Sequence, residues 1–256
     1  KVRGSWAQVG KDAEPYSTNT YLWPAQVVSS GYNGAGNSWT GGSPNLKPEI
    51  QTSYELGTEL KFLKGRLGLD FTYYHSTTKN QLASPRLAQS TGYIFLTLNS
   101  GSVTNKGVEL SINAIPIEKK DFKWDVTLNL SRNEGSLGNF LKGVGIFYVT
   151  DVQVGGVKAA SIPNGGYFLG LTGDYWLREK DTEGKEIKNG RYQIDPTTGQ
   201  YKPSGVTTNI VGNREPKMIG GLNNSFTYKN MNLSFLLDLR LGGDIYNGTE
   251  YNLIQS

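Results

Sequence analysis

The 256-residue chain is predicted to be all-β and to form a portion of a large antiparallel transmembrane β-barrel. Three observations predict this fold. Several segments alternate apolar and polar residues over about 10 to 12 positions, as strands with one apolar face do. Short turns alternate strictly with long polar connections between these segments. Aromatic side chains gather near the ends of the apolar faces, where a membrane barrel carries its girdles.

The composition excludes several kinds of chemistry. The chain has no cysteine and one histidine, His75, so thiol nucleophiles, cysteine-ligated metals and histidine-based triads lack their residues. Its 33 glycines and 15 tyrosines suit β structure with many turns, and no segment has a comparable helical period. The net charge of +4 is spread along the chain and does not favour nucleic-acid binding. We therefore expect no catalytic residues, no metal and no cofactor.

The chain opens with KVRGSWAQVG, which has strand character from the start. It carries neither a start methionine nor a signal peptide, so we expect the chain to be cut from a larger protein. The next strand, residues 52–62, reads TSYELGTELKF. Its apolar face carries Tyr54, Leu56, Thr58, Leu60 and Phe62, and its polar face carries Ser53, Glu55, Gly57, Glu59 and Lys61.

The third strand, residues 66–76, reads RLGLDFTYYHS. Leu67, Leu69, Phe71 and Tyr73 share one face, and Gly68, Asp70, Thr72 and Tyr74 share the other. Phe71 and Tyr73 are expected to face lipid, with Thr72 and Tyr74 in the lumen. From Ser76 onward the chain is expected to leave the membrane.

Four more segments repeat the pattern: residues 106–116, 122–133, 218–229 and 231–243. The clearest is FKWDVTLNLSRN, in which Phe122, Trp124, Val126, Leu128 and Leu130 alternate with polar residues. The last segment keeps Met231, Leu233, Phe235, Leu237, Leu239 and Leu241 in phase. The chain is thus expected to hold about seven strands of one barrel wall.

The connections favour a membrane barrel over a sandwich. Short turns are expected at 63–65, 118–120 and 229–230, and long polar segments at 11–50, 77–102 and 134–216. Short periplasmic turns and long extracellular loops are typical of outer-membrane barrels, whereas sandwiches use shorter strands and mixed loops. The longest segment, 134–216, is expected to be a folded extracellular loop with its own hairpin. In that hairpin, residues 190–194 pair with residues 200–203 across the turn at 196–199.

Aromatic residues give a separate indication of the two membrane interfaces. Phe62, Phe122, Trp124, Phe226 and Tyr228 lie on the apolar face near the short turns, and Tyr54 and Tyr73 lie towards the other end. This placement fits two girdles. The alternative is that these residues are ordinary core aromatics of a soluble β domain.

Four stretches resemble a known family. They are KVRGSWAQVGKDAEPY, NLKPEIQTSYELGTELKFLKGRLGLDFTYYHSTTKNQL, NSGSVTNKGVELSINAIPI and GNREPKMIGGLNNSFTYKNMNLSFLLDLRLGGDIYN. In this order, they resemble the SusC/RagA family of TonB-dependent outer-membrane transporters. The "LKPE" entry, the "VTNKGVE" run and the "EPKMIGGLN" strand carry the resemblance, which covers most of the chain outside the loops.

The resemblance implies a fold and a function beyond this chain. Members are 22-stranded barrels of Bacteroidetes-type outer membranes, with a plug, a segment that contacts TonB and a SusD-like lipoprotein lid. They import oligosaccharides or peptides, so no enzyme activity is expected. This chain would supply an internal portion of the barrel, and the plug and TonB-contacting segment have no counterpart in it.

Two groups of residues are candidates for substrate binding. Trp23, Tyr32 and Trp39 lie in a glycine- and asparagine-rich segment and could stack on sugar rings or flat side chains, or could only pack that loop. Glu55, Tyr74, Asp238 and Arg240 fall on the polar faces of strands and could line the lumen.

Two other functions remain as alternatives. A glycosidase would need carboxylates that flank a bond across a cleft, whereas Glu55 and Glu59 lie on one face of one strand, so lumen charges explain them better. A soluble carbohydrate-binding β-sandwich module is the other alternative, and such a module would stay soluble and monomeric without detergent.

Overall fold

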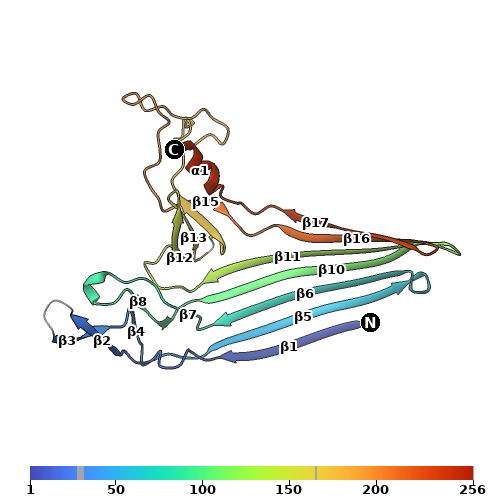
Figure 1. Cartoon of the computed structure of the whole chain (residues 1–256), viewed down its shortest axis with the longest axis horizontal. Coiled ribbons are helices and arrows are strands. Elements are labelled where there is room, and N and C mark those ends of the chain that lie inside the picture. Colours follow the sequence, from blue (N-terminus) through green and yellow to red (C-terminus); the bar gives the residue numbers. More distant parts are fainter. Residues whose placement is uncertain (28–31, 165, 256) are drawn as a thin grey trace.

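A computed structural model describes residues 1–27, 32–164 and 166–255. One antiparallel sheet of seven long strands dominates it (Figure 1). Each of these strands pairs with the next long strand along the chain. In order they are β1 (Val2–Lys11), β5 (Glu49–Phe62), β6 (Leu67–Lys79), β10 (Ser102–Lys119), β11 (Phe122–Gly138), β16 (Met218–Tyr228) and β17 (Met231–Leu241).

Four of these strands are longer than the sequence pattern predicted. β5 begins at Glu49, β6 continues past Ser76 to Lys79, β10 begins at Ser102, and β11 runs on to Gly138. The threonines of these extensions, such as Thr77 and Thr104, are β-branched and are therefore favoured in strands. The Thr77 and Thr104 hydroxyls, for example, share a hydrogen bond of 3.2 Å across β6 and β10. The sheet therefore continues for three residues past Ser76, the residue from which the chain was expected to leave the membrane.

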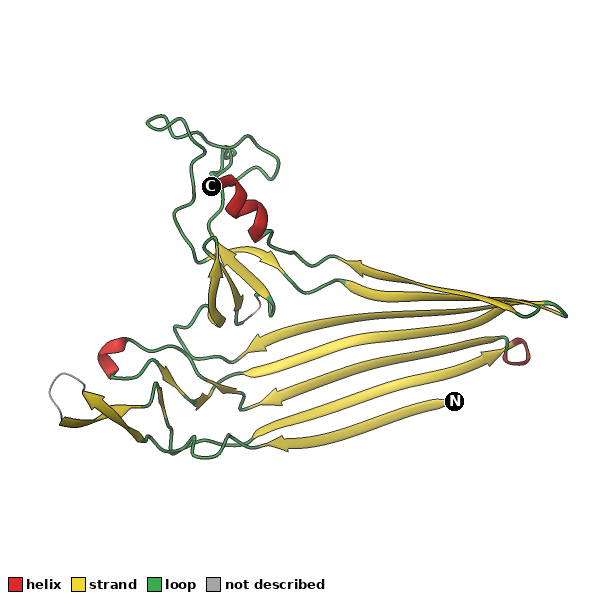
Figure 2. Cartoon of the chain, in the orientation of Figure 1, coloured by secondary structure: helices red, strands yellow, loops and turns green. Residues whose placement is uncertain are grey.

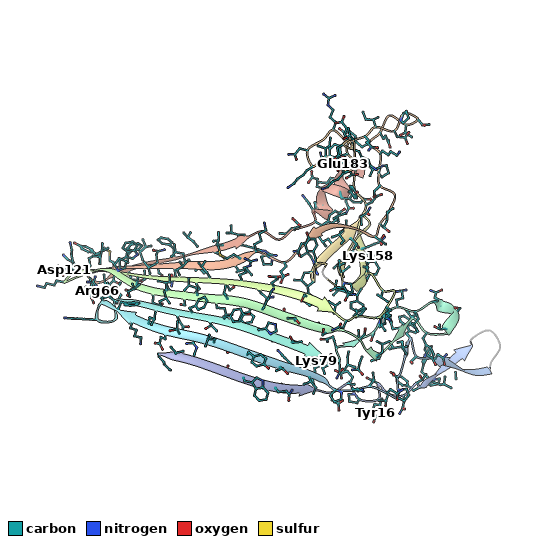
Figure 3. All side chains as sticks on the ribbon, turned by 180° about the vertical axis from the view of Figure 1, so that it is seen from behind. Tyr16, Arg66, Lys79, Asp121, Lys158 and Glu183 are labelled. Atoms are coloured by element: carbon teal, nitrogen blue, oxygen red, sulfur yellow. The ribbon has the colours of Figure 1, made fainter. Side chains whose placement is uncertain are left out.

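The short turns all lie at one end of the sheet. The first, η1 (Leu63–Gly65), holds Lys64 in the left-handed region at φ 55°. The second was predicted at 118–120 but lies after Lys119, because Lys119 still pairs with Phe122. The third comprises Lys229 and Asn230, between β16 and β17. Figure 3 labels Arg66 and Asp121 at this end.

A bulge interrupts β10 between Ala114 and Ile117. Pro116 has no N–H to donate to the ladder, so a bulge is where a strand tolerates it. The Arg66 guanidinium donates to the carbonyl oxygens of Ile115 and Pro116 at 3.0 and 3.1 Å, which satisfies groups that the bulge leaves unpaired.

The long connections lie at the opposite end and carry small structures of their own (Figure 2). These are the hairpin of β2 (Leu22–Val27) and β3 (Tyr32–Asn37), the pairs β4 (Thr40–Gly41) with β8 (Phe95–Leu96) and β7 (Leu82–Ala83) with β9 (Leu98–Asn99), the turn η2 (Gln89–Thr91), and helix α1 (Gly248–Gln255). In the described part of the chain, no helix has the length and apolar character needed to cross a bilayer.

The longest connection is folded. Within it, β12 (Phe147–Val154), β13 (Val157–Ser161), β14 (Gly170–Gly173) and β15 (Asn209–Asn213) form a four-stranded sheet that the sequence pattern did not reveal. Between β14 and β15, Ile194 pairs with Tyr201 in an antiparallel bridge across the turn where the sequence predicted a hairpin. The Asp195 amide donates to the Gln200 carbonyl at 2.8 Å and closes that turn.

The two faces of the long sheet differ in chemistry. Pairing places one apolar row across six strands: Leu60, Leu69, Ile112, Leu128, Leu222 and Leu237. Leu56 on the same face is 60% exposed and Leu237 is 56% exposed. The described residues place no second sheet against this face, which a soluble sandwich would require. Water is an unfavourable environment for so much apolar surface, so a bilayer is the cover that fits it.

Aromatic side chains cluster on this face near the short turns. Trp124 stacks on Phe226 at 5.5 Å between ring centroids, and Phe226 contacts Phe122 and Phe235 at 6.5 and 6.1 Å. The buried core is confined to the loop end, where Ala83, Leu137 and Phe140 pack together. The wall therefore gains little from burial within the described residues.

Candidate functional site

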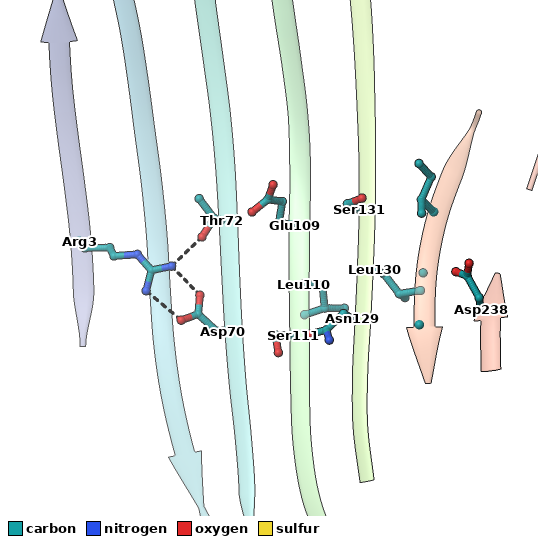
Figure 4. Close-up of a pocket in the computed structure, with 13 residues that line it drawn as sticks. Arg3, Asp70, Thr72, Glu109, Leu110, Ser111, Asn129, Leu130, Ser131 and Asp238 are labelled. Carbon is teal, nitrogen blue, oxygen red and sulfur yellow. Dashed lines mark hydrogen bonds and ion pairs between the residues drawn. The ribbon is translucent and has the colours of Figure 1, made fainter. Parts of the chain in front are cut away.

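The polar face of the long sheet carries a shallow hollow of about 460 Å³ (Figure 4). Successive residues of a strand point to opposite faces, so the polar half of each strand is presented here. The hollow crosses strands from β1 to β17 and is lined by Arg3, Asp70, Thr72, Glu109, Leu110, Ser111, Asn129, Leu130, Ser131, Ile219, Gly220, Gly221 and Asp238.

Arg3 and Asp70 form the strongest polar contact in the hollow. The guanidinium donates to both carboxylate oxygens, Nη1 to Oδ2 at 2.9 Å and Nη2 to Oδ1 at 2.6 Å, and Nη2 also donates to Thr72 Oγ1 at 2.7 Å. Both side chains of the ion pair stay partly exposed. Solvent screens such a pair, so it contributes little to stability. Its main effect is to fix the position of two charges.

A glycine makes this contact possible. Arg3 lies on β1 and Asp70 on β6, so the arginine side chain must cross β5, where Gly57 pairs with Arg3. A Cβ atom on Gly57 would lie 2.7 Å from Arg3 Nε. A side chain at this position would therefore force the Arg3 side chain to shift.

The Tyr74 side chain also reaches across a glycine of the neighbouring strand, two residues after Thr72 on β6. Its hydroxyl crosses Gly107 on β10 and donates to Asn133 Oδ1 on β11 at 2.9 Å. A Cβ atom on Gly107 would overlap the tyrosine ring and hydroxyl. Asn133 in turn donates to Glu215 Oε1 at 3.2 Å, so β6 and β11 are linked to the connection that precedes β16.

The predicted lumen residues share this polar face. Asp238 lines the hollow, and Glu55 pairs with Tyr74 in the adjacent row. Arg240 pairs with Ile219, which lines the hollow, and donates to the Arg214 carbonyl at 3.2 Å.

The predicted aromatic residues do not join them. Trp23 lies in β2, where its Nε1 donates to the Asn37 carbonyl at 2.9 Å. Trp39 follows β3 and is 71% exposed. Tyr32 lies in β3 opposite Val27, and its side chain is outside the described part of the structure. Neither Trp23 nor Trp39 lines the hollow.

Sequence reasoning missed several residues of the hollow, above all Arg3. Alternation had placed Asp70 and Thr72 on the polar face but had assigned them no role. The contact of Arg3 with Asp70 depends on how β1, β5 and β6 are aligned. The available signal was Gly57, because a glycine inside a strand often marks a close approach.

The hollow offers hydrogen bonds and charge for binding a solute. Asp70, Glu109 and Asp238 supply carboxylates, Arg3 supplies the one guanidinium of the lining, and serine, threonine and asparagine supply neutral groups. The described residues contain no group of three or more histidine, cysteine, aspartate or glutamate side chains placed to hold a metal ion. The geometry is that of a solvated wall with binding groups.

Comparison with known proteins places this wall among membrane receptors. A sequence profile described as "TonB dependent receptor-like, beta-barrel" matches residues 1–247. TonB-dependent receptor P26 of Formosa agariphila is 28% identical over 261 residues, which cover 96% of this chain and 26% of that protein. TonB-dependent receptor SusC of Bacteroides thetaiotaomicron is 28% identical over 218 residues, covering 79% of this chain and 20% of SusC.

Solved structures give the same fold. The chain superposes on the RagAB peptide importer in its closed-closed state with a TM-score of 0.73 and 19% identity, covering 94% of this chain and 26% of that one. In these comparisons the chain spans between a fifth and about a quarter of the length of the relatives it matches.

Proposed function

The chain belongs to the family of TonB-dependent receptor-like β-barrels of the outer membrane, and from this premise we propose that its protein imports oligosaccharides or peptides. The observation that carries the proposal is the two-faced wall. One face is apolar and exposed along the strands, and the other holds a hydrogen-bonding hollow of about 460 Å³. A barrel with such a wall contacts lipid outside and a solute inside.

The import barrel must contain more strands than those described. Both β1 and β17 are outer strands of the seven-stranded sheet within the described residues. Unpaired strand edges are not tolerated in the hydrocarbon layer, so further strands have to close the barrel around the lumen. The relatives are about four times as long as the matched region, which leaves room for those strands and for a plug.

Import in this family couples to partners, and we extend this to the present protein as a proposal. A SusD-like surface lipoprotein would close the barrel from outside, and TonB would act through a plug. The connection from Asn139 to Lys217 is the best candidate for contact with the lipoprotein. It is the longest connection, it is folded, and it stands beyond the long-loop end of the wall (Figure 1).

Substrate contacts are proposed at two levels. Glu55, Tyr74, Asp238 and Arg240 would meet substrate within the lumen, because they share the polar face with the hollow. Trp23, Tyr32 and Trp39 would meet it earlier, in the connection between β1 and β5.

Uptake by whole cells tests the proposal. Cells that carry the complete protein should accumulate labelled oligosaccharides or peptides, and a protonophore should abolish the accumulation because TonB needs the energised inner membrane. Uptake of neither class, or uptake that the protonophore leaves unchanged, would contradict TonB-dependent import. The soluble-module alternative is tested on the purified protein. A lectin-like module would remain monomeric in buffer without detergent.

A further inference from the structure

The apolar face of the wall changes its chemistry toward the long-loop end, where Figure 3 labels Lys79. Strand pairing gives three successive rows across β6, β10 and β11: Phe71, Leu110 and Leu130; then Tyr73, Val108 and Arg132; then His75, Lys106 and Glu134. The first row is wholly apolar, whereas all three residues of the third row are ionisable. The row after it consists of Thr77, Thr104 and Ser136. The edge of the hydrocarbon layer therefore falls at the second and third rows.

Aromatic side chains mark the same level on the neighbouring strands. Trp6 pairs with Tyr54, and Tyr54 pairs with His75 of the third row. Trp6 is 61% exposed and Tyr54 is 55% exposed. Exposed tryptophan and tyrosine rings on a lipid-facing surface are typical of the headgroup level, because one end of each ring is apolar and the other is polar. Lipid headgroups are therefore expected beside the third row.

Arg132 is a cation at the edge of this apolar face. Its side chain is exposed, and no ion pair or hydrogen bond joins its guanidinium to any residue that the structure describes. Its carbon stem can lie along the apolar surface while the charge reaches the interface. A cation in this position is stabilised by water or by an anionic headgroup. The planar guanidinium offers two parallel donors, which match a phosphate group.

Lys106 provides a second cation next to Arg132. Arg132 pairs with Val108, so Lys106 is its diagonal neighbour across β10 and β11. Diagonal neighbours lie about 7–8 Å apart, within reach of long side chains. The Lys106 ammonium lies 3.3 Å from Glu134 Oε1, and both side chains are about half exposed. An ammonium has three donors, so Lys106 can keep Glu134 and still bind a second anion. Glu134 offsets one of the two cations, and the other remains for a ligand.

We propose that Arg132 and Lys106 bind the phosphate group of a lipid in the outer leaflet, on the outside of the barrel. Arg132 supplies a pair of donors and Lys106 a point charge, while the acyl chains lie along the apolar rows that contain Val108 and Leu130. This surface faces away from the lumen, so the proposal adds a lipid partner to the import function and does not depend on the substrate.

Native mass spectrometry of the complete barrel, with lipid added in detergent, tests the site because it counts bound lipids and gives their affinity. The probe is lipid A that carries one phosphate, and its twin is the same lipid without the phosphate. The phosphorylated lipid should bind about tenfold or more tightly than its twin. Arg132→Gln and Lys106→Gln should each weaken its binding about fivefold. Both variants should leave binding of the twin unchanged, which shows that they are folded. Glu134→Gln should strengthen binding of the phosphorylated lipid, because it removes the opposing carboxylate.

Lys123→Gln is the matched control. Lys123 lies on β11 like Arg132 but nine positions earlier, so it points to the opposite face, and it is near the short turns. Equal affinity for the two lipids would overturn the proposal, as would equal effects of the Arg132→Gln and Lys123→Gln variants. Displacement of the lipid by excess inorganic phosphate alone would show a simple anion site and would overturn the assignment to a lipid. Whole-cell uptake is scored separately, so the import function can fail while this site stands, and the reverse.

Discussion

Replacing Leu128 by arginine should destabilise the inserted barrel strongly. Leu128 lies within β11 and pairs with Ile112 on one side and Leu222 on the other, in the middle of the apolar row. An arginine there would place a guanidinium among hydrocarbon chains. Charged substitutions on the lipid face near the bilayer midplane cost about 2–4 kcal/mol.

The neighbouring Thr127 provides the control. Thr127 points to the polar face, where its hydroxyl donates to Asn113 Oδ1 at 3.0 Å. Thr127→Arg loses that one exposed hydrogen bond and gains a charge in a solvated lumen, so it should cost about 1 kcal/mol or less. The two variants carry the same new side chain at adjacent positions, and only the face differs.

Urea titration of the complete barrel in lipid vesicles measures both costs through tryptophan fluorescence. The free energy of unfolding should fall by at least about 1 kcal/mol more for Leu128→Arg than for Thr127→Arg. Equal losses, or a larger loss for Thr127→Arg, would refute the assignment of the two faces.

Three further predictions concern other parts of the molecule. Gly107→Val should displace the Tyr74 ring and break its hydrogen bond to Asn133. Tyr74→Phe in the Gly107→Val background should then add almost no further loss of stability in the urea titration. A full additional loss would show that the contact survives. Cysteines at Lys64 and Lys120 should resist an impermeant thiol reagent on intact cells, while a cysteine at Thr182 should react; labelling at the two turns would place the short-turn end outside the cell. Deleting residues 181–204 should leave the barrel inserted but weaken lipoprotein association or uptake. Failure to insert would make this segment part of the folding core of the wall.

Alternation predicted six of the seven long strands, because a bilayer on one side and water on the other impose a period of two. Alternation underestimated the length of the strands where both faces of the sheet are exposed to water. At Thr77 and Thr104 the backbone still pairs, but no apolar residue marks the strand. Within the missed sheet of β12 to β15, β14 shows the opposite reason. All four of its residues, Gly170–Gly173, are buried, so no exposed position alternates with a buried one.

The hollow could be predicted only in part. Polar faces were assigned residue by residue, and Asp238, one of the predicted lumen residues, lines the hollow. Contacts between strands that are not neighbours, such as that of Arg3 with Asp70, follow from strand alignment and side-chain length. A single sequence gives only a set of alternatives for the strand alignment.

The glycine beneath Tyr74 also bears on how the wall avoids misassembly. If β6 slid by two residues along β10, every apolar side chain would keep its face, so alternation cannot reject this decoy. The slip would bring Asn105 or Glu109, in place of Gly107, beneath the tyrosine ring. Neither side chain leaves room for the hydroxyl to reach Asn133. The fit of Tyr74 over Gly107 thus disfavours a two-residue slip in register that the hydrophobic pattern alone would allow.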